Sequence, residues 1–305
     1  MKVGVLYDQG SSQYREDGLY AGTRIFGVAD GVSAPYNKWN PPMLFDGQTG
    51  GEMVARVFER KLALTDRDGF AGYGLAGLPN MARDVNFVVG EIQKGRGLSL
   101  DCPEDLAGAT FAMVWVTEHE VEIIQAGDCF ALWVTTGGGV GITTNQVRRH
   151  DTAMNALILN IQREIAAERG LDLESVDDQR RGEIRTEMWR QFYEPLKAAR
   201  REDVNNPKSQ RGYGLLNGQL ALEQMWFHGA LPRAMLKTVL LFSDGMVPWE
   251  RMKDQPEVAI AKEVYQTFTS GGLSKVLGVA RGIEEATKAS SYANAAEATA
   301  ISIEF

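Results

Sequence analysis

The chain has 305 residues, of which 44% are hydrophobic and 24% are charged, and its formal net charge is −8 at pH 7. This composition is typical of a globular protein and excludes fibrous, disordered and membrane-spanning classes. The negative charge argues against a nucleic-acid partner, because binding a phosphate backbone requires a concentrated positive surface. Two cysteines are too few for a disulfide framework, and the first residues do not read as a signal peptide. We therefore expect a cytoplasmic protein with no membrane partner.

The chain begins with short hydrophobic strands and continues with amphipathic helices. Residues 1–7 and 24–29 are rich in Val, Ile, Leu and Phe, which predicts strands, with a polar loop between them. Hydrophobic residues then recur at helical spacing around 53–58 and 81–92. Two helices are expected there.

Short strands in close succession are predicted in the middle of the chain, at 110–116, 121–126, 130–135 and 141–144. The connections between them are too short for crossover helices, which favours an antiparallel meander. A charged stretch with helical periodicity follows at about 151–203.

A buried strand at 239–242 runs into a Ser-Asp-Gly turn, two amphipathic helices follow, and the chain ends in a strand at 298–305. Strands, then helices, then strands again, without alternating βαβ units, predict an α+β fold. No internal repeat or low-complexity linker divides the chain. We expect one domain over residues 1–305, with a helical insertion at about 151–203.

Acidic residues repeatedly stand where a predicted strand meets a loop. They are Glu16, Asp17, Asp30, Asp128, Asp244 and Glu297. A single Asp-Gly pair is an ordinary turn, so the ordered set is the informative feature. Carboxylates at strand ends can converge on one rim of a sheet, and oxygen ligands suit Mg²⁺ or Mn²⁺ better than zinc or copper. The glycine after Asp30 also allows a backbone carbonyl to come close to an ion.

This ordered set resembles the successive motifs of the metal-dependent type 2C (PPM) Ser/Thr protein phosphatases. The matching segments are EDG at 16–18, FGVADG at 26–31, GAT at 108–110, AGDC at 126–129, LLFSDG at 240–245 and EATAI at 297–301. The resemblance extends from about residue 3 to the C-terminus. It implies a four-layer αββα sandwich of two antiparallel β-sheets flanked by helices.

The resemblance also implies a centre for two Mg²⁺ or Mn²⁺ ions. By position, Asp30 would bridge the two ions. Glu16 and the carbonyl oxygen of Gly31 would serve one ion, and Asp244 would serve the other. Such a pair of ions activates a water molecule that attacks the phosphorus in line, so no covalent intermediate is needed.

Further roles follow from the same resemblance. Asp17 would hold the attacking water by a hydrogen bond. Asp128 and Asp244 match the carboxylates that hold a third, weaker ion in some bacterial members.

The chain departs from the family pattern at three places. Ala296 stands where the family has an Asp ligand, and Glu297, one residue later, is the candidate replacement. Ser12 stands at the position of the phosphate-gripping Arg, which makes the nearby Arg15 the candidate. The loop at 32–35 reads Val-Ser-Ala-Pro instead of Met-Gly-Gly-His.

The expected function is hydrolysis of phosphoserine and phosphothreonine in phosphorylated proteins. The change at Ala296 leaves open a catalytically impaired pseudophosphatase that acts as a binding or regulatory module. An enzyme for small phosphate esters is a third alternative. The helical insertion is expected at the mouth of the active site, where it would select the substrate. The histidines, His119, His150 and His228, lack metal-ligand spacing and are expected to be structural.

Overall fold

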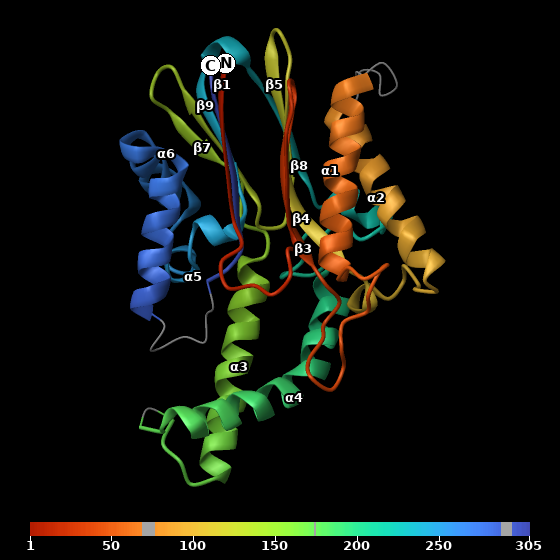
Figure 1. The fold of residues 1–305 in the computed structure, drawn as a ribbon, viewed down its shortest axis with the longest axis vertical. Helices are drawn as coiled ribbons and strands as arrows, with labels where there is room; N and C mark the ends of the chain where they lie inside the picture. Colours follow the sequence, from red (N-terminus) through yellow and green to blue (C-terminus); the bar gives the residue numbers. More distant parts are fainter. Residues whose placement is uncertain (69–76, 174, 288–294) are drawn as a thin grey trace.

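The computed structural model describes residues 1–68, 77–173, 175–287 and 295–305. Two antiparallel sheets of five strands each pack face to face, and helices cover the outer face of both (Figure 1). The predicted α+β fold with a four-layer αββα sandwich is therefore confirmed. Within the described ranges, no helix combines the length and the hydrophobicity needed to cross a membrane.

The first sheet joins the two ends of the chain and has the order β1-β10-β9-β6-β7. Its strands are β1 (Lys2–Asp8), β10 (Ala298–Glu304), β9 (Leu236–Phe242), β6 (Phe130–Thr135) and β7 (Val140–Ile142). Asp8, at the end of β1, is the register partner of Ala298, at the start of β10. The loop after β1 therefore lies beside the segment that enters β10.

The second sheet has the order β2-β3-β4-β5-β8. Its strands are β2 (Asp17–Ala21), β3 (Ile25–Val32), β4 (Gly108–Val116), β5 (Glu120–Ala126) and β8 (Phe227–Pro232). The sequence analysis missed both edge strands, β2 and β8. Their short sequences contain glycine and lack a clear strand pattern, and each pairs with a single neighbouring strand.

The predicted four-stranded meander is wrong in one respect. β4 and β5 form a hairpin in the second sheet, whereas β6 and β7 form a hairpin in the first. The chain crosses between the sheets at Gly127, whose φ is +81°, where a Cβ atom would lie 2.2 Å from the Thr110 side chain. A short connection does not distinguish a turn between paired strands from a step between layers. The crossing leaves Asp128 between the two sheets.

The inner faces of both sheets form one hydrophobic core. Its largest contributors include Phe26, Val28, Val114, Ile123, Val239, Leu241, Ile301 and Ile303. On the outer faces, α1 (Gly50–Asp68) and α2 (Gly77–Gly95) pack on the second sheet. α5 (Trp249–Met252) and α6 (Glu257–Thr287) pack on the first.

The two helices predicted before the last strand are the two halves of α6. The helix is interrupted at Gly271 and Gly272, where the backbone is not helical, and Gly272 has a φ of +71°. Only glycine adopts this conformation at little cost, so the break follows from the sequence.

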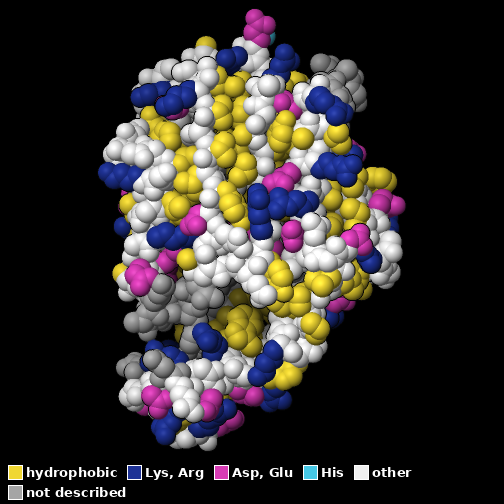
Figure 2. Space-filling model, in the orientation of Figure 1, with side chains coloured by type: hydrophobic (Ala, Val, Ile, Leu, Met, Phe, Trp, Pro, Cys, Tyr) yellow, Lys and Arg dark blue, Asp and Glu magenta, His cyan; other side chains and the backbone are white. Residues whose placement is uncertain are grey.

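The helical prediction for 151–203 is also confirmed, by α3 (Arg148–Glu168) and α4 (Asp178–Asp203). These two helices, called the arm below, project from one end of the sandwich (Figure 1). The arm has its own hydrophobic core, which includes Ile161, Ile165, Ile184, Met188 and Phe192. In the space-filling view a hollow with hydrophobic side chains on its floor separates the arm from the body (Figure 2).

The turn after β9 is so tight that adding one methyl group at Gly245 should lower the stability of the protein. A Cβ atom on Gly245 would lie 1.8 Å from the carbonyl oxygen of Glu297. We expect Gly245→Ala to lower the free energy of unfolding by about 2 kcal/mol, because the backbone must shift to accept it. The exposed Gly278 in α6 has no atom within 4 Å of such a position, so Gly278→Ala should raise stability by about 0.5–1 kcal/mol. Urea unfolding of both variants tests this, and an unchanged midpoint for Gly245→Ala would contradict it.

Candidate metal centre

The structure brings together four of the predicted site residues at one end of the sandwich. Asp17 and Asp30 are register partners in β2 and β3. The side chain of Asp30 shares a hydrogen bond with that of Asp244, which follows β9. Asp128 stands at the crossing between the sheets, and its negative charge acts on Asp30 and Asp244. Both sheets therefore contribute carboxylates to one region.

These carboxylates lie close to one another, with Asp17 and Asp128 buried and Asp30 and Asp244 half-buried, and their pKa values rise for that reason. Burial raises the pKa of Asp30 well above its usual value, and the charges of Asp17 and Asp244 raise it further. Burial and the charge of Asp128 do the same to the pKa of Asp244. Burial raises the pKa of Asp17 to about 7. Taking several like charges out of water in one place is costly unless they are protonated or neutralised by a cation.

A fifth carboxylate, Asp151, belongs to the same group and was missed by the sequence analysis. It lies in the first turn of α3, and the segment before α3 is tied to the crossing between the sheets. The backbone N–H of Gln146 donates to the carbonyl of Gly127 at 3.0 Å, and Gln146 Oε1 accepts from the N–H of Gly127 at 2.9 Å. Burial and the charge of Asp128 raise the pKa of Asp151 to about 7. In the sequence, an acid in a first helical turn indicates only a favourable contact with the helix dipole.

Glu16 lies beside these carboxylates and is held through one of its oxygens. Its Oε1 accepts hydrogen bonds from the hydroxyls of Ser33 at 2.5 Å and Thr49 at 2.6 Å. The backbone comes unusually close at Gly31, where a Cβ atom would lie 2.4 Å from the carbonyl oxygen of Glu16 and 2.5 Å from that of Gly51. A side chain has no room there, so a glycine at this position lets the three backbone segments pack directly against one another.

Arg15 lies at the rim of the centre. Its guanidinium stacks over the ring of Tyr7 at 4.3 Å from the ring centroid, and one nitrogen is 3.8 Å from Glu59 Oε1. The side chain is 41% exposed, and its buried Nε has no hydrogen-bond partner. An anion arriving from solvent can therefore reach this guanidinium.

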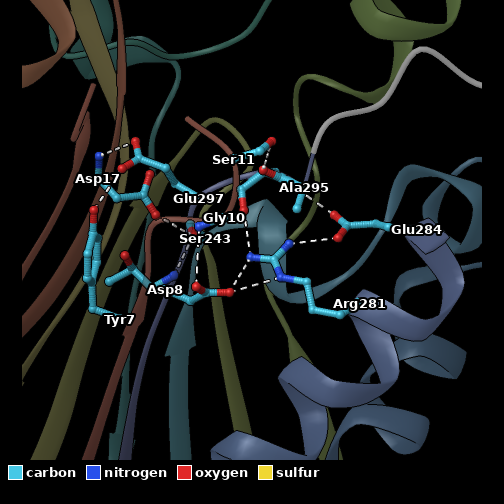
Figure 3. A network of polar contacts seen from close by, with 12 residues as sticks. Tyr7, Asp8, Gly10, Ser11, Asp17, Ser243, Arg281, Glu284, Ala295 and Glu297 are labelled. Atoms are coloured by element: carbon cyan, nitrogen blue, oxygen red, sulfur yellow. Dashed lines mark hydrogen bonds and ion pairs between the residues drawn. The ribbon is translucent and has the colours of Figure 1, made fainter. Parts of the chain in front are cut away.

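Glu297 lies in the same region, just before β10, but protein donors occupy its carboxylate. Tyr7 donates to one oxygen, and the N–H groups of Glu16 and Asp17 donate to the other (Figure 3). The carbonyl oxygen of the preceding Ala296 accepts from the Arg281 guanidinium at 2.6 Å.

The donor atoms of the centre fit a divalent cation by their chemistry. They are carboxylate oxygens, the kind of ligand that Mg²⁺ and Mn²⁺ prefer. Among the described residues, only Cys102, Glu104 and Asp105 bring three ligand atoms within 4.8 Å of one another, so the carboxylates of the centre are spaced more widely. Glu104 and Asp105 are already paired with Arg201 and Lys197.

The arm is anchored beside the centre at both of its ends. Arg200, near the end of α4, is buried and donates to the carbonyls of Leu106 at 2.8 Å and Ser33 at 3.4 Å. His150, at the start of α3, contacts Asp203, at the end of α4, with 2.9 Å between Nδ1 and Oδ2. Burial lowers the pKa of His150, which therefore joins the two helices as a neutral ring.

The raised pKa values predict how the metal-free protein responds to pH. Asp151 has a pKa of about 7 in the folded protein against an ordinary value of 3.8, so the folded state binds a proton that the unfolded state has lost. Stability should therefore fall as pH rises towards and through 7, by about 2 kcal/mol for such a group between pH 5.5 and 8.5. Asp151→Asn removes this pH dependence, so its gain in Tm over wild type should be larger at pH 8.5 than at pH 5.5 by the equivalent of about 2 kcal/mol, at roughly 2–4 °C per kcal/mol.

Thermal unfolding in the presence of a chelator measures this effect. Glu118→Gln, at an exposed turn outside the centre, serves as the control and should leave the pH dependence unchanged. Equal Tm differences between the two pH values in wild type and Asp151→Asn would show that Asp151 is not part of the buried charge cluster.

Comparison with known proteins gives the fold of this chain. No family model and no curated protein matches its sequence. The serine/threonine phosphatase PstP/Ppp of Mycobacterium tuberculosis matches with a TM-score of 0.56 and 14% identity, over 100% of this chain and 98% of that one. The catalytic domain of PstP in complex with two manganese ions matches with a TM-score of 0.54 and 15% identity, over 99% and 96%.

A phosphatase from another organism matches to a similar degree. Stp1 from Staphylococcus aureus has a TM-score of 0.53 and 11% identity, over 100% of this chain and 94% of that one. At such low identity the matches establish architecture only. The chain has the two-sheet sandwich fold of the PPM-type Ser/Thr phosphatases.

Proposed function

We propose that the protein is a Mg²⁺- or Mn²⁺-dependent phosphatase that hydrolyses phosphoserine and phosphothreonine in proteins. The observation that carries this proposal is the contact between the half-buried Asp30 and Asp244, with the buried Asp17 and Asp128 beside it. The fold adds support, because a structural neighbour with the same architecture binds two manganese ions.

In this proposal the chain holds two cations through oxygen atoms. Asp30 would contact both, Glu16 and the carbonyl of Gly31 would hold one, and Asp244 the other. Asp128 with Asp244 would hold a third, weaker cation. Bound cations of this kind acidify water and offset the charge of a phosphoryl group.

Two residues would act on the reactants directly. Asp17 would accept a hydrogen bond from the attacking water, and Ser243 fixes its orientation by donating to Oδ2 at 2.8 Å. Arg15 would bind phosphoryl oxygens through the nitrogens that face solvent, while Tyr7 supports its guanidinium from the other side.

We further propose that the protein acts in the cytoplasm and that the arm selects its substrate. Arg200 ties the end of α4 to the carbonyl of Ser33, and His150 ties the start of α3 to the end of α4. Both ends of the arm are therefore beside the centre. A hollow lies between the arm and the body (Figure 2). A phosphorylated segment of a protein bound there would be close to the carboxylates.

A second candidate function is a pseudophosphatase that binds phosphorylated proteins without turnover. It is favoured by Ala296, whose side chain provides no ligand, and by the contacts that occupy Glu297. The enzyme needs two bound cations, whereas this candidate predicts one or none.

The test is release of phosphate from phosphoserine and phosphothreonine peptides. We expect turnover only when Mn²⁺ or Mg²⁺ is added, and we expect Asp30→Ala to abolish it, because Asp30 would contact both cations. Asp254→Ala, at an exposed turn between α5 and α6, is the matched control and should behave as wild type. Small phosphate esters assayed alongside reveal whether a peptide is required.

Activity that persists in excess chelator, or in Asp30→Ala, would refute the enzymatic proposal. Absence of turnover together with fewer than two bound Mn²⁺ ions in calorimetry would favour the pseudophosphatase. In that case Ala296→Asp, which adds a carboxylate two residues before β10, should create activity.

A further inference from the structure

Glu297 makes contacts that suit a different task from cation binding. Its Oε1 accepts a hydrogen bond from the Tyr7 hydroxyl at 2.9 Å. Its Oε2 accepts from the backbone N–H of Glu16 at 2.7 Å and of Asp17 at 3.1 Å. A carboxylate has about four acceptor positions on its two oxygens, so protein donors use most of them. Figure 3 shows the carboxylate turned towards the start of β2.

The two N–H groups that Glu297 holds belong to residues of the candidate centre. Each N–H is bonded to the Cα atom that carries the side chain of Glu16 or Asp17. Hydrogen bonds from backbone N–H groups to a charged carboxylate are about twice as strong as neutral ones. Fixing both groups at one oxygen therefore fixes where these side chains begin.

Tyr7 makes this contact a stable one. Burial, followed by the hydrogen bond to Glu297, raises the pKa of the Tyr7 hydroxyl, so the hydroxyl keeps its proton and remains a donor. The same ring supports the guanidinium of Arg15 on its face. One tyrosine thus links Glu297 to the rim of the centre.

The chain before Glu297 is fixed by a separate set of contacts. Arg281 of α6 donates to the carbonyl of Ala296 at 2.6 Å and to Asp8 Oδ2 at 3.0 and 2.8 Å. The backbone N–H of Ser11 donates to the carbonyl of Ala295 at 2.9 Å. Figure 3 shows Ser11 and Ala295 beside Glu297, and Arg281 and Asp8 below it. The base from which the Glu297 side chain projects is therefore held from both β1 and α6.

We propose that Glu297 is a positioning residue that holds Glu16 and Asp17 in place, and that it does not bind a cation. Its catalytic consequence depends on the phosphatase function proposed above, but its contacts do not. The segment that leads into β10 then contributes to the centre by fixing the start of β2. The cation ligands come from the other elements.

Three variants and one control test this proposal by calorimetry with Mn²⁺ and by amide hydrogen exchange. Glu297→Ala should bind as many Mn²⁺ ions as wild type, with an affinity lowered about 3- to 30-fold, and the amides of Glu16 and Asp17 should exchange faster. Glu297→Gln keeps a neutral acceptor oxygen and should restore most of the affinity. Tyr7→Phe should lower the affinity less than Glu297→Ala. Glu304→Ala, at the exposed end of the same strand, should change none of these values.

Amide hydrogen exchange of the wild-type protein tests the proposal without relying on any variant. If Glu297 positions the backbone, the Glu16 and Asp17 amides are protected both without Mn²⁺ and with it. If Glu297 is a ligand, Mn²⁺ draws the carboxylate away and these amides exchange faster, and Glu297→Ala loses one ion; either result overturns the proposal. A wild-type protein that binds no Mn²⁺ would refute the phosphatase function, whereas protected amides would still support the positioning role.

Discussion

Aspartates from both sheets meet in the interior at one end of the sandwich, and their mutual repulsion constrains that end of the molecule. Asp17 and Asp30 are opposite each other in one backbone ladder, so strand pairing keeps their Cα atoms close together. Asp128 and Asp244 stand on tight turns that follow core strands. Repulsion between charges is much stronger in a protein interior than in water. The sandwich core therefore holds together groups that would separate in the unfolded chain, and either protons or a cation must offset their charge.

The surrounding contacts keep these groups in fixed places and leave oxygens free. Ser243 orients Asp17, and two hydroxyls hold one oxygen of Glu16. Glu297 holds the backbone of β2, and Arg281 holds the chain that leads to Glu297. The metal centre proposed above would require such support, because side chains that are loosely held lose the geometry that cation binding needs.

The arm is linked to the centre by charge and by hydrogen bonds. Asp151, in the first turn of α3, adds a carboxylate to the buried group. Arg200, at the end of α4, reaches the carbonyl of Ser33, whose hydroxyl donates to Glu16. A displacement at the root of the arm would therefore change the charge and the support of the centre. The separate hydrophobic core of the arm lets it keep its shape at a distance from the sandwich.

The sequence by itself determined most of the elements and the types of residue in the centre. Hydrophobic periodicity located the helices and the central strands, and the order of the acidic motifs indicated the fold. It did not locate β2 and β8, because these short, glycine-containing edge strands lack a strand pattern and form through pairing with one neighbour. It also did not reveal the step between sheets at Gly127, because short connections look alike in sequence.

Tertiary structure alone decided which acidic side chains lie together and what each one contacts. Asp151 enters the centre because hydrogen bonds tie the start of α3 to Gly127, and no local pattern encodes that contact. Glu297 resembles a ligand in the sequence, yet the folded chain offers it two backbone N–H groups and a tyrosine hydroxyl. Sequence fixes which donors and acceptors exist, whereas partners far apart in the chain are chosen only when packing brings them within hydrogen-bonding distance.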